Sequence, residues 1–186
     1  IVRNEQANLV RCLMSVRDVV DEMIVVDTGS TDRTKDLAAI FGAKVFDHPW
    51  RDDFGEARNA SLAEASGDWI LVIDADETLS SRDHAALRIL ISKSPKKIGG
   101  YDLDTRNYVT EANTAGWTAN DGSYPGDEAG TGWYANRKVR LFRNDPRIRF
   151  SGAVHELVEE SLDQAGMKIG ACDVPVHHTG KLDRAR

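Results

Sequence analysis

The chain has 186 residues, of which 41% are hydrophobic and 29% charged, and its formal net charge is −6. This length and composition suit one globular domain with a sizeable core. The acidic balance argues against a nucleic-acid partner, because proteins that bind the phosphate backbone show a basic face and usually a basic total. No apolar run approaches the length that spans a bilayer.

The two cysteines, Cys12 and Cys172, are too few and too distant in sequence for a disulfide framework or a thiolate metal site. We expect both to be small buried apolar residues, as in a reducing cytoplasm. The opening residues Ile1 to Glu5 look like the end of a strand. We therefore expect an incomplete first strand and a longer parent protein.

Helix and strand patterns alternate through residues 1–98, which predicts repeated β-α units with right-handed crossovers. Apolar residues at helical spacing and apolar runs give the boundaries. Ser80 and Asp83 predict a capping box for the last helix of this half, which closes before Pro95. The expected elements are helices over 9–16, 34–41 and 56–65, a helix that starts at the Ser80 cap and carries Leu87, Leu90 and Ile91, and strands over 23–26, 43–46 and 69–73.

Residues 99–186 have a different texture. Strands are predicted over 101–109 and 138–143, further extended segments over 148–154 and 167–177, and a short helix over 157–164. A polar loop, 111–132, is either disordered or a functional lid. Its neighbouring aromatic residues Trp117, Tyr124 and Trp133 would pack on a sugar ring or belong to the core.

The apolar run that starts at Trp69 ends in two carboxylates, Asp74 and Asp76. It is typical of an interior strand of a parallel sheet, and ligands bind beyond the carboxyl ends of such strands. Carboxylates at positions i and i+2 can bind a hard divalent cation together, and such a cation neutralises phosphate oxygens. The alternative is that one or both acids only cap the following turn.

The chain as a whole resembles the family 2 glycosyltransferases with a GT-A fold, in particular small bacterial, non-processive members. The resemblance is carried by motifs in a fixed order: Val2-Arg3-Asn4-Glu5, Val25 to Asp32, Trp50 through Phe54 to Asn59, Ile73 to Glu77, Arg140-Leu141-Phe142-Arg143, Val154-His155-Glu156 and His178-Thr179-Gly180. It implies a single α/β domain over residues 1–186, with a central, mostly parallel sheet flanked by helices. Residues 1–98 would form the nucleotide-binding half and residues 99–186 the acceptor and catalytic half.

The resemblance also implies a nucleotide-binding set, made up of Arg3, Glu5, Asp27, Arg58 and Asp74. Asp27 would accept the imide hydrogen of uracil, unless it only caps the next helix. The guanidinium of Arg58 suits phosphate oxygens, although an arginine on a helix is usually solvated surface.

A divalent metal, Mn²⁺ or Mg²⁺, would bind Asp76 directly, with His178 as a further ligand by resemblance. Neighbouring His177 is an alternative ligand, and a lone histidine is often structural. Glu156 would be the general base that takes the proton of the acceptor hydroxyl, unless His155 has that role or Glu156 lies on a solvated helix face.

The function implied is a metal-dependent, inverting transfer of a sugar from a nucleotide-diphosphate donor, with UDP expected, to a carbohydrate, lipid-linked or peptide acceptor. We expect a cytoplasmic protein, with peripheral membrane contact if the acceptor is lipid-linked. Two alternatives compete: a phosphatase of the haloacid-dehalogenase type, with Asp74 as nucleophile and Asp76 as acid/base, and a non-catalytic nucleotide-sugar-binding module.

Overall fold

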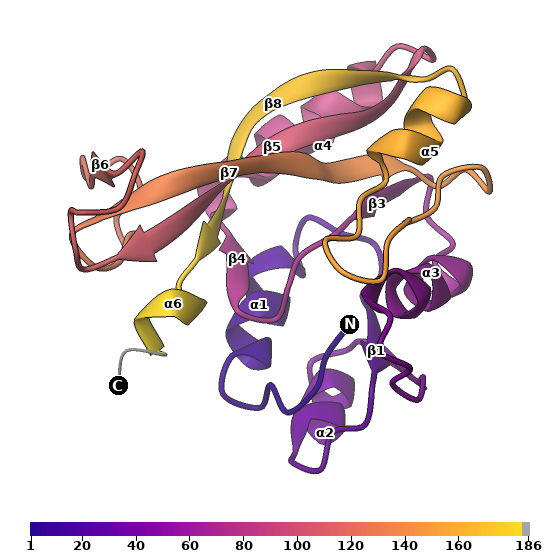
Figure 1. Cartoon of the computed structure of the whole chain (residues 1–186), viewed down its shortest axis with the longest axis horizontal. Coiled ribbons are helices and arrows are strands. Elements are labelled where there is room, and N and C mark those ends of the chain that lie inside the picture. The colour runs from indigo at the N-terminus through magenta and orange to yellow at the C-terminus, as the bar shows by residue number, and fades with distance from the viewer. Residues whose placement is uncertain (184–186) are drawn as a thin grey trace.

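Two β-sheets organise the chain in the computed structural model, which describes residues 1–183 (Figure 1). The smaller sheet pairs β1 (Ile24–Asp27) with β2 (Lys44–Asp47) in parallel, and Val2 adds an isolated parallel bridge to Asp27. The larger sheet has the strand order β3-β7-β5-β8-β4, with β6 beside β7. Its strands are β3 (Trp69–Leu71), β4 (Glu77–Leu79), β5 (Ile98–Val109), β6 (Thr118–Ala119), β7 (Gly132–Arg143) and β8 (Lys168–His178).

The prediction of a mostly parallel sheet is wrong for the larger sheet. Among its described pairings only β5 with β8 is parallel, and the pairings of β3, β4 and β6 and of β5 with β7 are antiparallel. The run from Trp69 is therefore no interior parallel strand. It makes two short strands separated by a turn, in which Glu77 N donates to Asp74 O at 3.0 Å. An apolar run indicates that a strand is buried on both faces. It does not indicate whether the neighbouring strands run parallel or antiparallel to it.

The predicted helices lie close to the expected positions: α1 (Leu9–Val16), α2 (Thr34–Ile40), α3 (Phe54–Glu64), α4 (His84–Lys93) and α5 (Glu159–Gln164). The 3-10 turn η1 (Ser81–Asp83) and the helix α6 (Gly180–Asp183) were not predicted. The capping box predicted at Ser80 is wrong, because its side chain makes no capping hydrogen bond and η1 precedes α4. Helix α3 is capped by Asp53, which accepts from Glu56 N at 2.8 Å. This cap fixes the start of the helix that carries Arg58.

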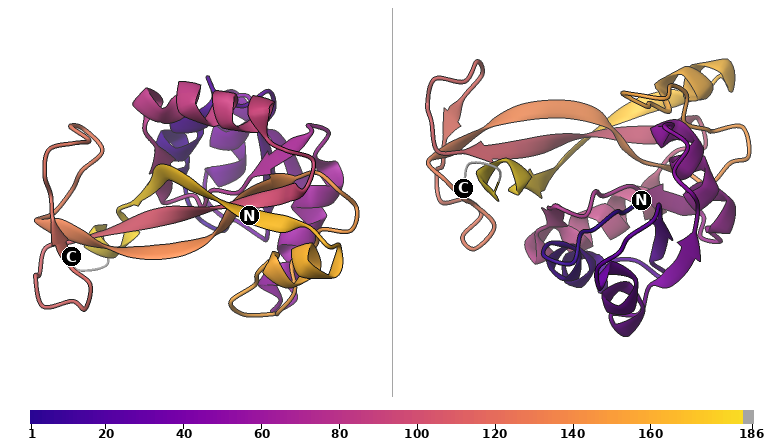
Figure 2. Two further views of the ribbon diagram at one scale, coloured as in Figure 1. Left: turned by 90° about the horizontal axis from the view of Figure 1, so that it is seen from above. Right: turned by 60° about the horizontal axis from the view of Figure 1, so that its bottom comes forward.

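The helices and the small sheet of the first half pack on one side of the long strands β5, β7 and β8, and the ends of β5 and β7 that the 110–131 loop joins extend beyond them (Figure 2). Both cysteines are free and buried as predicted, and burial raises the pKa of Cys12 to about 12. No helix among residues 1–183 is long and apolar enough to cross a membrane.

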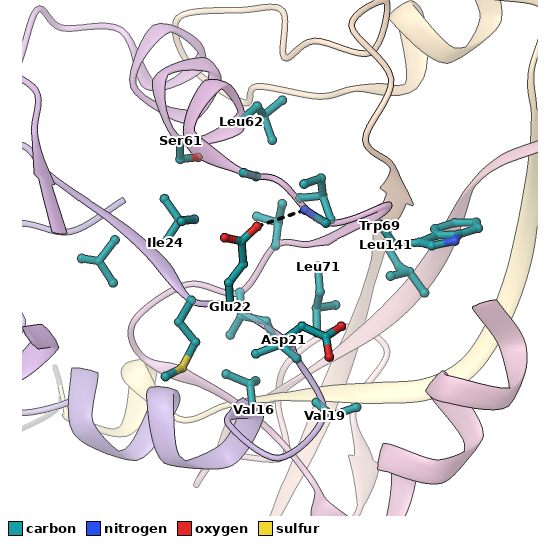
Figure 3. A pocket seen from close by; sticks show the side chains of 18 of the residues that line it. Val16, Val19, Asp21, Glu22, Ile24, Ser61, Leu62, Trp69, Leu71 and Leu141 are labelled. Atoms are coloured by element: carbon teal, nitrogen blue, oxygen red, sulfur yellow. Dashed lines mark hydrogen bonds between the residues drawn. The ribbon is translucent and has the colours of Figure 1, made fainter. Parts of the chain in front are cut away.

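A cavity of about 370 Å³ lies between the first-half helices and strands β1 and β3 (Figure 3). Its lining is mainly aliphatic, with Val16, Leu62 and Leu71 among the members. The carboxylate of Glu22 accepts hydrogen bonds there from Ser66 N and Gly67 N, at 2.6 and 3.0 Å. Asp76 and Glu156, the predicted metal ligand and general base, do not line this cavity.

The polar loop 111–132 packs against the sheet through Tyr124, beside Trp133 of β7. Tyr124 is buried against His177, with ring centroids 4.7 Å apart. Arg106 of β5 lies over the rings of both Tyr124 and Trp133, at 4.7 and 4.5 Å. These contacts follow the core alternative of the sequence analysis, since neither aromatic ring lines the cleft described next.

Candidate functional site

A cleft of about 840 Å³ collects residues from both halves of the chain. It is lined by the turn after β3 that carries Asp74 and Asp76 (the DxD turn), by α3, by β5 and β7, and by the loop before α5. Most of the predicted site residues line it, namely Arg3, Glu5, Arg58, Asp74, Asp76, Glu156 and His178. Asp27 does not.

Arg58 joins two predicted site residues that lie 82 positions apart in the sequence. Its Nη2 donates to Asp74 Oδ1 at 2.8 Å and its Nε to Glu156 Oε1 at 2.5 Å. Only 9% of the Arg58 side chain is exposed. Burial alone would raise the pKa of Asp74, but the positive charges of Arg58, Arg140 and Lys138 outweigh it and hold that pKa well below its usual range. Both carboxylates therefore face the cleft beside a fixed cation.

The loop that carries Glu156 is held by the same helix. Asn59 donates from Nδ2 to Phe150 O and accepts from Phe150 N, both at 2.9 Å. Phe54 N donates to Ala153 O at 3.0 Å. A Cβ at Gly55 would lie 2.7 Å from Gly152 O, so only glycine allows this close approach. Glu156 thus lies in a loop that hydrogen bonds hold to α3. It does not lie on a solvated helix face, because α5 starts only at Glu159.

His178 and Asp76 meet at the other side of the cleft. His178 Nε2 lies 3.1 Å from Asp76 Oδ2, and His178 Nδ1 lies 2.7 Å from Asn107 Oδ1. Asn107 donates from Nδ2 to Thr105 O and Tyr134 O, which turns its carbonyl oxygen toward the histidine. His178 Nδ1 is therefore the donor, and Nε2 faces the carboxylate. The hydrogen bond to Asp76 raises the pKa of His178, and its partner's pKa is lowered in return.

This arrangement fits a divalent cation. A histidine that binds a metal through one ring nitrogen usually donates a hydrogen bond from the other to a carbonyl or carboxylate oxygen. His178 Nδ1 makes such a bond to Asn107 Oδ1. Gly180 leaves the space open, because a Cβ there would collide with Asp76 Oδ2 and come within 3.0 Å of His178 Nε2. Among residues 1–183 no group of three or more His, Cys, Asp or Glu side chains converges. Oxygens of a bound substrate or water would have to complete the shell.

A buried ion pair is bonded to the backbone of the DxD turn. Arg140 and Glu77 are 2% and 4% exposed, and Nη2 of Arg140 lies 2.5 Å from Oε1 of Glu77. Glu77 Oε2 also accepts from Asp74 N at 2.9 Å. The pair therefore fixes the backbone at the first acid of the motif.

The remaining predicted residues have local contacts. Asp27 Oδ2 accepts from Gly29 N and Ser30 N, at 2.9 and 2.8 Å, and so caps the turn after β1. It does not cap the next helix, because α2 has Arg33 at its N-cap position. Its buried Oδ1 has no hydrogen-bond partner among residues 1–183. Glu5 Oε2 accepts from Asn8 Nδ2 at 3.1 Å. Asp27 thus lies outside the cleft lining, next to Thr28, which does line it, and its Oδ1 is buried.

The structure separates the two adjacent histidines. His177 is fully buried, its Nδ1 lies 2.8 Å from the hydroxyl of Tyr108, and burial lowers its pKa to about 4. It does not line the cleft, whereas His178 does. The geometry places His177 in the core and leaves His178 beside Asp76.

Sequence reasoning gave no role to Asn107, Glu77, Arg140 or Lys138. Glu77 and Arg140 stand inside motifs that carried the family resemblance, so their positions were available as a signal. Asn107 and Lys138 lie on strands β5 and β7, outside these motifs, and no sequence signal pointed to them. Their proximity to the site follows from strand pairing alone.

Comparison with known proteins assigns the class. The profile of the family described as Glycosyl transferase family 2 matches residues 1–114, and the chain belongs to this family. It is 43% identical, over 87% of its length, to a TPR repeat-containing protein of Synechococcus elongatus. It is 46% identical over 82 residues, or 43% of its length, to an uncharacterized glycosyltransferase of Rickettsia typhi. The chain spans 35% and 27% of these two relatives, about a third of their length.

Solved structures show the same GT-A fold. Glucosyl-3-phosphoglycerate synthase of Mycobacterium tuberculosis, in complex with Mn²⁺, UDP and glucosyl-3-phosphoglycerate, matches with a TM-score of 0.60 and 20% identity. The match covers 99% of this chain and 72% of that protein. The α/β, GT-A prediction is therefore confirmed for the fold, with the correction to the sheet given above.

Proposed function

We propose that this chain is a metal-dependent, inverting glycosyltransferase that moves a sugar from a UDP-sugar to an acceptor hydroxyl. The observation that carries the proposal is one cleft that brings Asp76 and His178 together on one side and Glu156 on the other. The synthase with the same fold was crystallised with UDP and Mn²⁺, which supports the choice of nucleotide and metal class. The family assignment favours this function over the phosphatase alternative.

In the proposed site Asp76 and His178 Nε2 would hold Mn²⁺ or Mg²⁺, and the metal would supply positive charge against the departing diphosphate. Arg3 and Glu5 contact the nucleotide at the cleft wall. Oδ1 of Asp27 accepts from the base after the turn that follows β1 opens, because this oxygen is buried and Asp27 does not line the cleft. Asp74, fixed by Arg58, orients the ribose side of the donor.

Glu156 is proposed as the general base. Its Oε1 is bound to Arg58, which leaves the other carboxylate oxygen to accept the proton of an acceptor hydroxyl on the face of the sugar opposite the diphosphate. Attack from that face inverts the anomeric configuration. Removing this carboxylate would lower turnover by about 10²–10⁴-fold, the usual contribution of a positioned base.

Calorimetric titration with UDP, with and without Mn²⁺, tests the donor site. We expect binding to the wild-type protein that requires the metal and is lost in Asp76→Ala, with Asp163→Ala on exposed α5 as the matched control. A second comparison uses Glu156→Gln, which should bind UDP normally but release UDP from UDP-sugars about 10²–10⁴-fold more slowly in turnover, with Glu64→Gln as control. Absence of metal-dependent UDP binding in the wild type would refute the donor assignment. Normal binding with no turnover by the wild type of any UDP-sugar and acceptor offered would favour the non-catalytic alternative.

A further inference from the structure

Most cationic side chains in the cleft already have carboxylate partners. Arg58 is bound to Asp74 and Glu156, and Arg140 to Glu77. Arg137 pairs with Asp104, its Nε lying 2.9 Å from Oδ1. The cationic lysine and arginine residues that line the cleft are Arg3, Arg58, Arg137, Lys138 and Arg140.

Lys138 differs from these arginines. It lies on β7, opposite Leu103 of β5, and is half-buried in the cleft wall between Arg137 and Arg140. Among residues 1–183 its ammonium makes no hydrogen bond or salt bridge, although Asp74 and Glu77 act on it through space. Arg3 is also without a charged partner there, but it is exposed, so water solvates its guanidinium.

A half-buried ammonium without a close partner is energetically costly for the free protein. Burial and the charge of Arg140 lower the pKa of Lys138, while Asp74 and Glu77 act in the opposite direction. The attraction of these two acids is shared, since Asp74 is bound to Arg58 and Glu77 to Arg140. An anion that enters the cleft would give Lys138 the partner that the protein does not supply.

We propose that Lys138 forms an anion subsite, which binds a phosphate-type oxyanion of a substrate through its ammonium group. The inference rests on the proposed function, because it places this oxyanion in the glycosyl-transfer cleft. The oxyanion has two sources: the diphosphate of the donor or a charged group on the acceptor. Lys138 then determines specificity for an anionic substrate group, whereas Arg58 and Arg140 fix the protein's own carboxylates.

The test uses Lys138→Met, which keeps the length of the side chain without its charge, and Lys138→Arg, which keeps the charge. Lys168→Met, at the exposed start of β8 and outside the cleft, is the matched control. Melting temperatures of all variants show first that they are folded. UDP is titrated with Mn²⁺, and inorganic phosphate is then titrated into protein saturated with UDP and Mn²⁺.

If the donor diphosphate binds Lys138, Lys138→Met weakens UDP binding about ten- to a hundredfold, as expected for one charge-assisted hydrogen bond, and Lys138→Arg restores most of it. If the acceptor supplies the anion, UDP binding is unchanged and phosphate binding to the UDP-saturated protein is lost in Lys138→Met. Equal binding of UDP and of phosphate by Lys138→Met and the wild type overturns the subsite. Failure of the wild type to bind UDP refutes the proposed function instead, and phosphate titration without UDP then decides on Lys138 alone.

Discussion

The buried pair of Arg140 and Glu77 gives the sharpest prediction for stability. In Arg140→Met the carboxylate of Glu77, which is 4% exposed, loses the bidentate partner that neutralises it. Breaking a buried pair from one side costs about 3–5 kcal/mol. Domains of 150–250 residues lose about 2–4 °C of Tm for each kcal/mol, so Tm should fall by about 6–20 °C. The loss is large beside a total free energy of unfolding of about 5–15 kcal/mol.

Urea and thermal unfolding followed by circular dichroism measure this loss. Arg137→Met is the matched control on the same strand, because Arg137 pairs with Asp104 at the surface, where 41% of its side chain is exposed. Such exposed pairs contribute about 0–1 kcal/mol. The double variant Glu77→Met with Arg140→Met should regain part of the stability, since no buried charge remains unpaired. Equal Tm shifts for Arg140→Met and Arg137→Met would refute the reasoning.

Three further predictions concern the site and the cavity beside β1. Asn59→Ala leaves Phe150 N and O unpaired, so we expect a loss of about 1–3 kcal/mol in unfolding free energy and slower turnover, measured by urea unfolding and kcat. Gly180→Ala places a methyl group against Asp76, so metal-dependent UDP binding in calorimetry should be lost while Tm stays nearly constant. The pKa of Glu22 is lowered to about 2 by its hydrogen bonds to Lys44 and to backbone amides, so its contribution to stability is complete above its unfolded pKa near 4.5 and disappears as pH falls toward 2. The wild type should therefore exceed Glu22→Gln in Tm at pH 7 and approach it near pH 2.

Each of these has a result that would contradict it. Unchanged kcat in Asn59→Ala would show that the Glu156 loop does not depend on α3. Retained metal dependence in Gly180→Ala would place the metal away from Asp76. A constant Tm difference between the wild type and Glu22→Gln from pH 7 to pH 2 would mean that the carboxylate is not stabilised in the folded state.

Local patterns were sufficient to locate helices α1 to α5, because apolar spacing and glycine stops are properties of a few consecutive residues, but they missed η1 and α6. The direction of the sheet was mispredicted, since strands β3 and β7 meet across about 70 residues and nothing in either segment records the partner. The motif residues Asp74, Asp76 and Glu156 line one cleft, and their role in catalysis stays a prediction. The bond between Arg58 and Glu156 joins positions 98 residues apart and could only be seen in three dimensions.

The sequence also gave no sign that residues of β5 and β7 line the cleft. Asn107 orients His178, and Lys138 stands in the wall facing the acids, but each looks like an ordinary polar residue of an exposed strand. A period-two pattern tells which residues share a face of a strand and not what that face adjoins. Sequence reasoning therefore found the residues with family motifs and missed those that position them.

The large sheet makes the chain hard to divide. Strands β3 and β4 come from residues 1–98, yet β3 pairs with β7 and β4 with β8, both from residues 99–186. A cut near residue 98 would leave unpaired strand edges on both fragments, and such edges invite aggregation. Segment exchanges between relatives should therefore keep this sheet intact and be confined to the 110–131 loop, whose two ends lie side by side where Thr131 N donates to Val109 O at 3.0 Å. A grafted loop of different length would then start and end at two positions that the β5–β7 pairing already holds together.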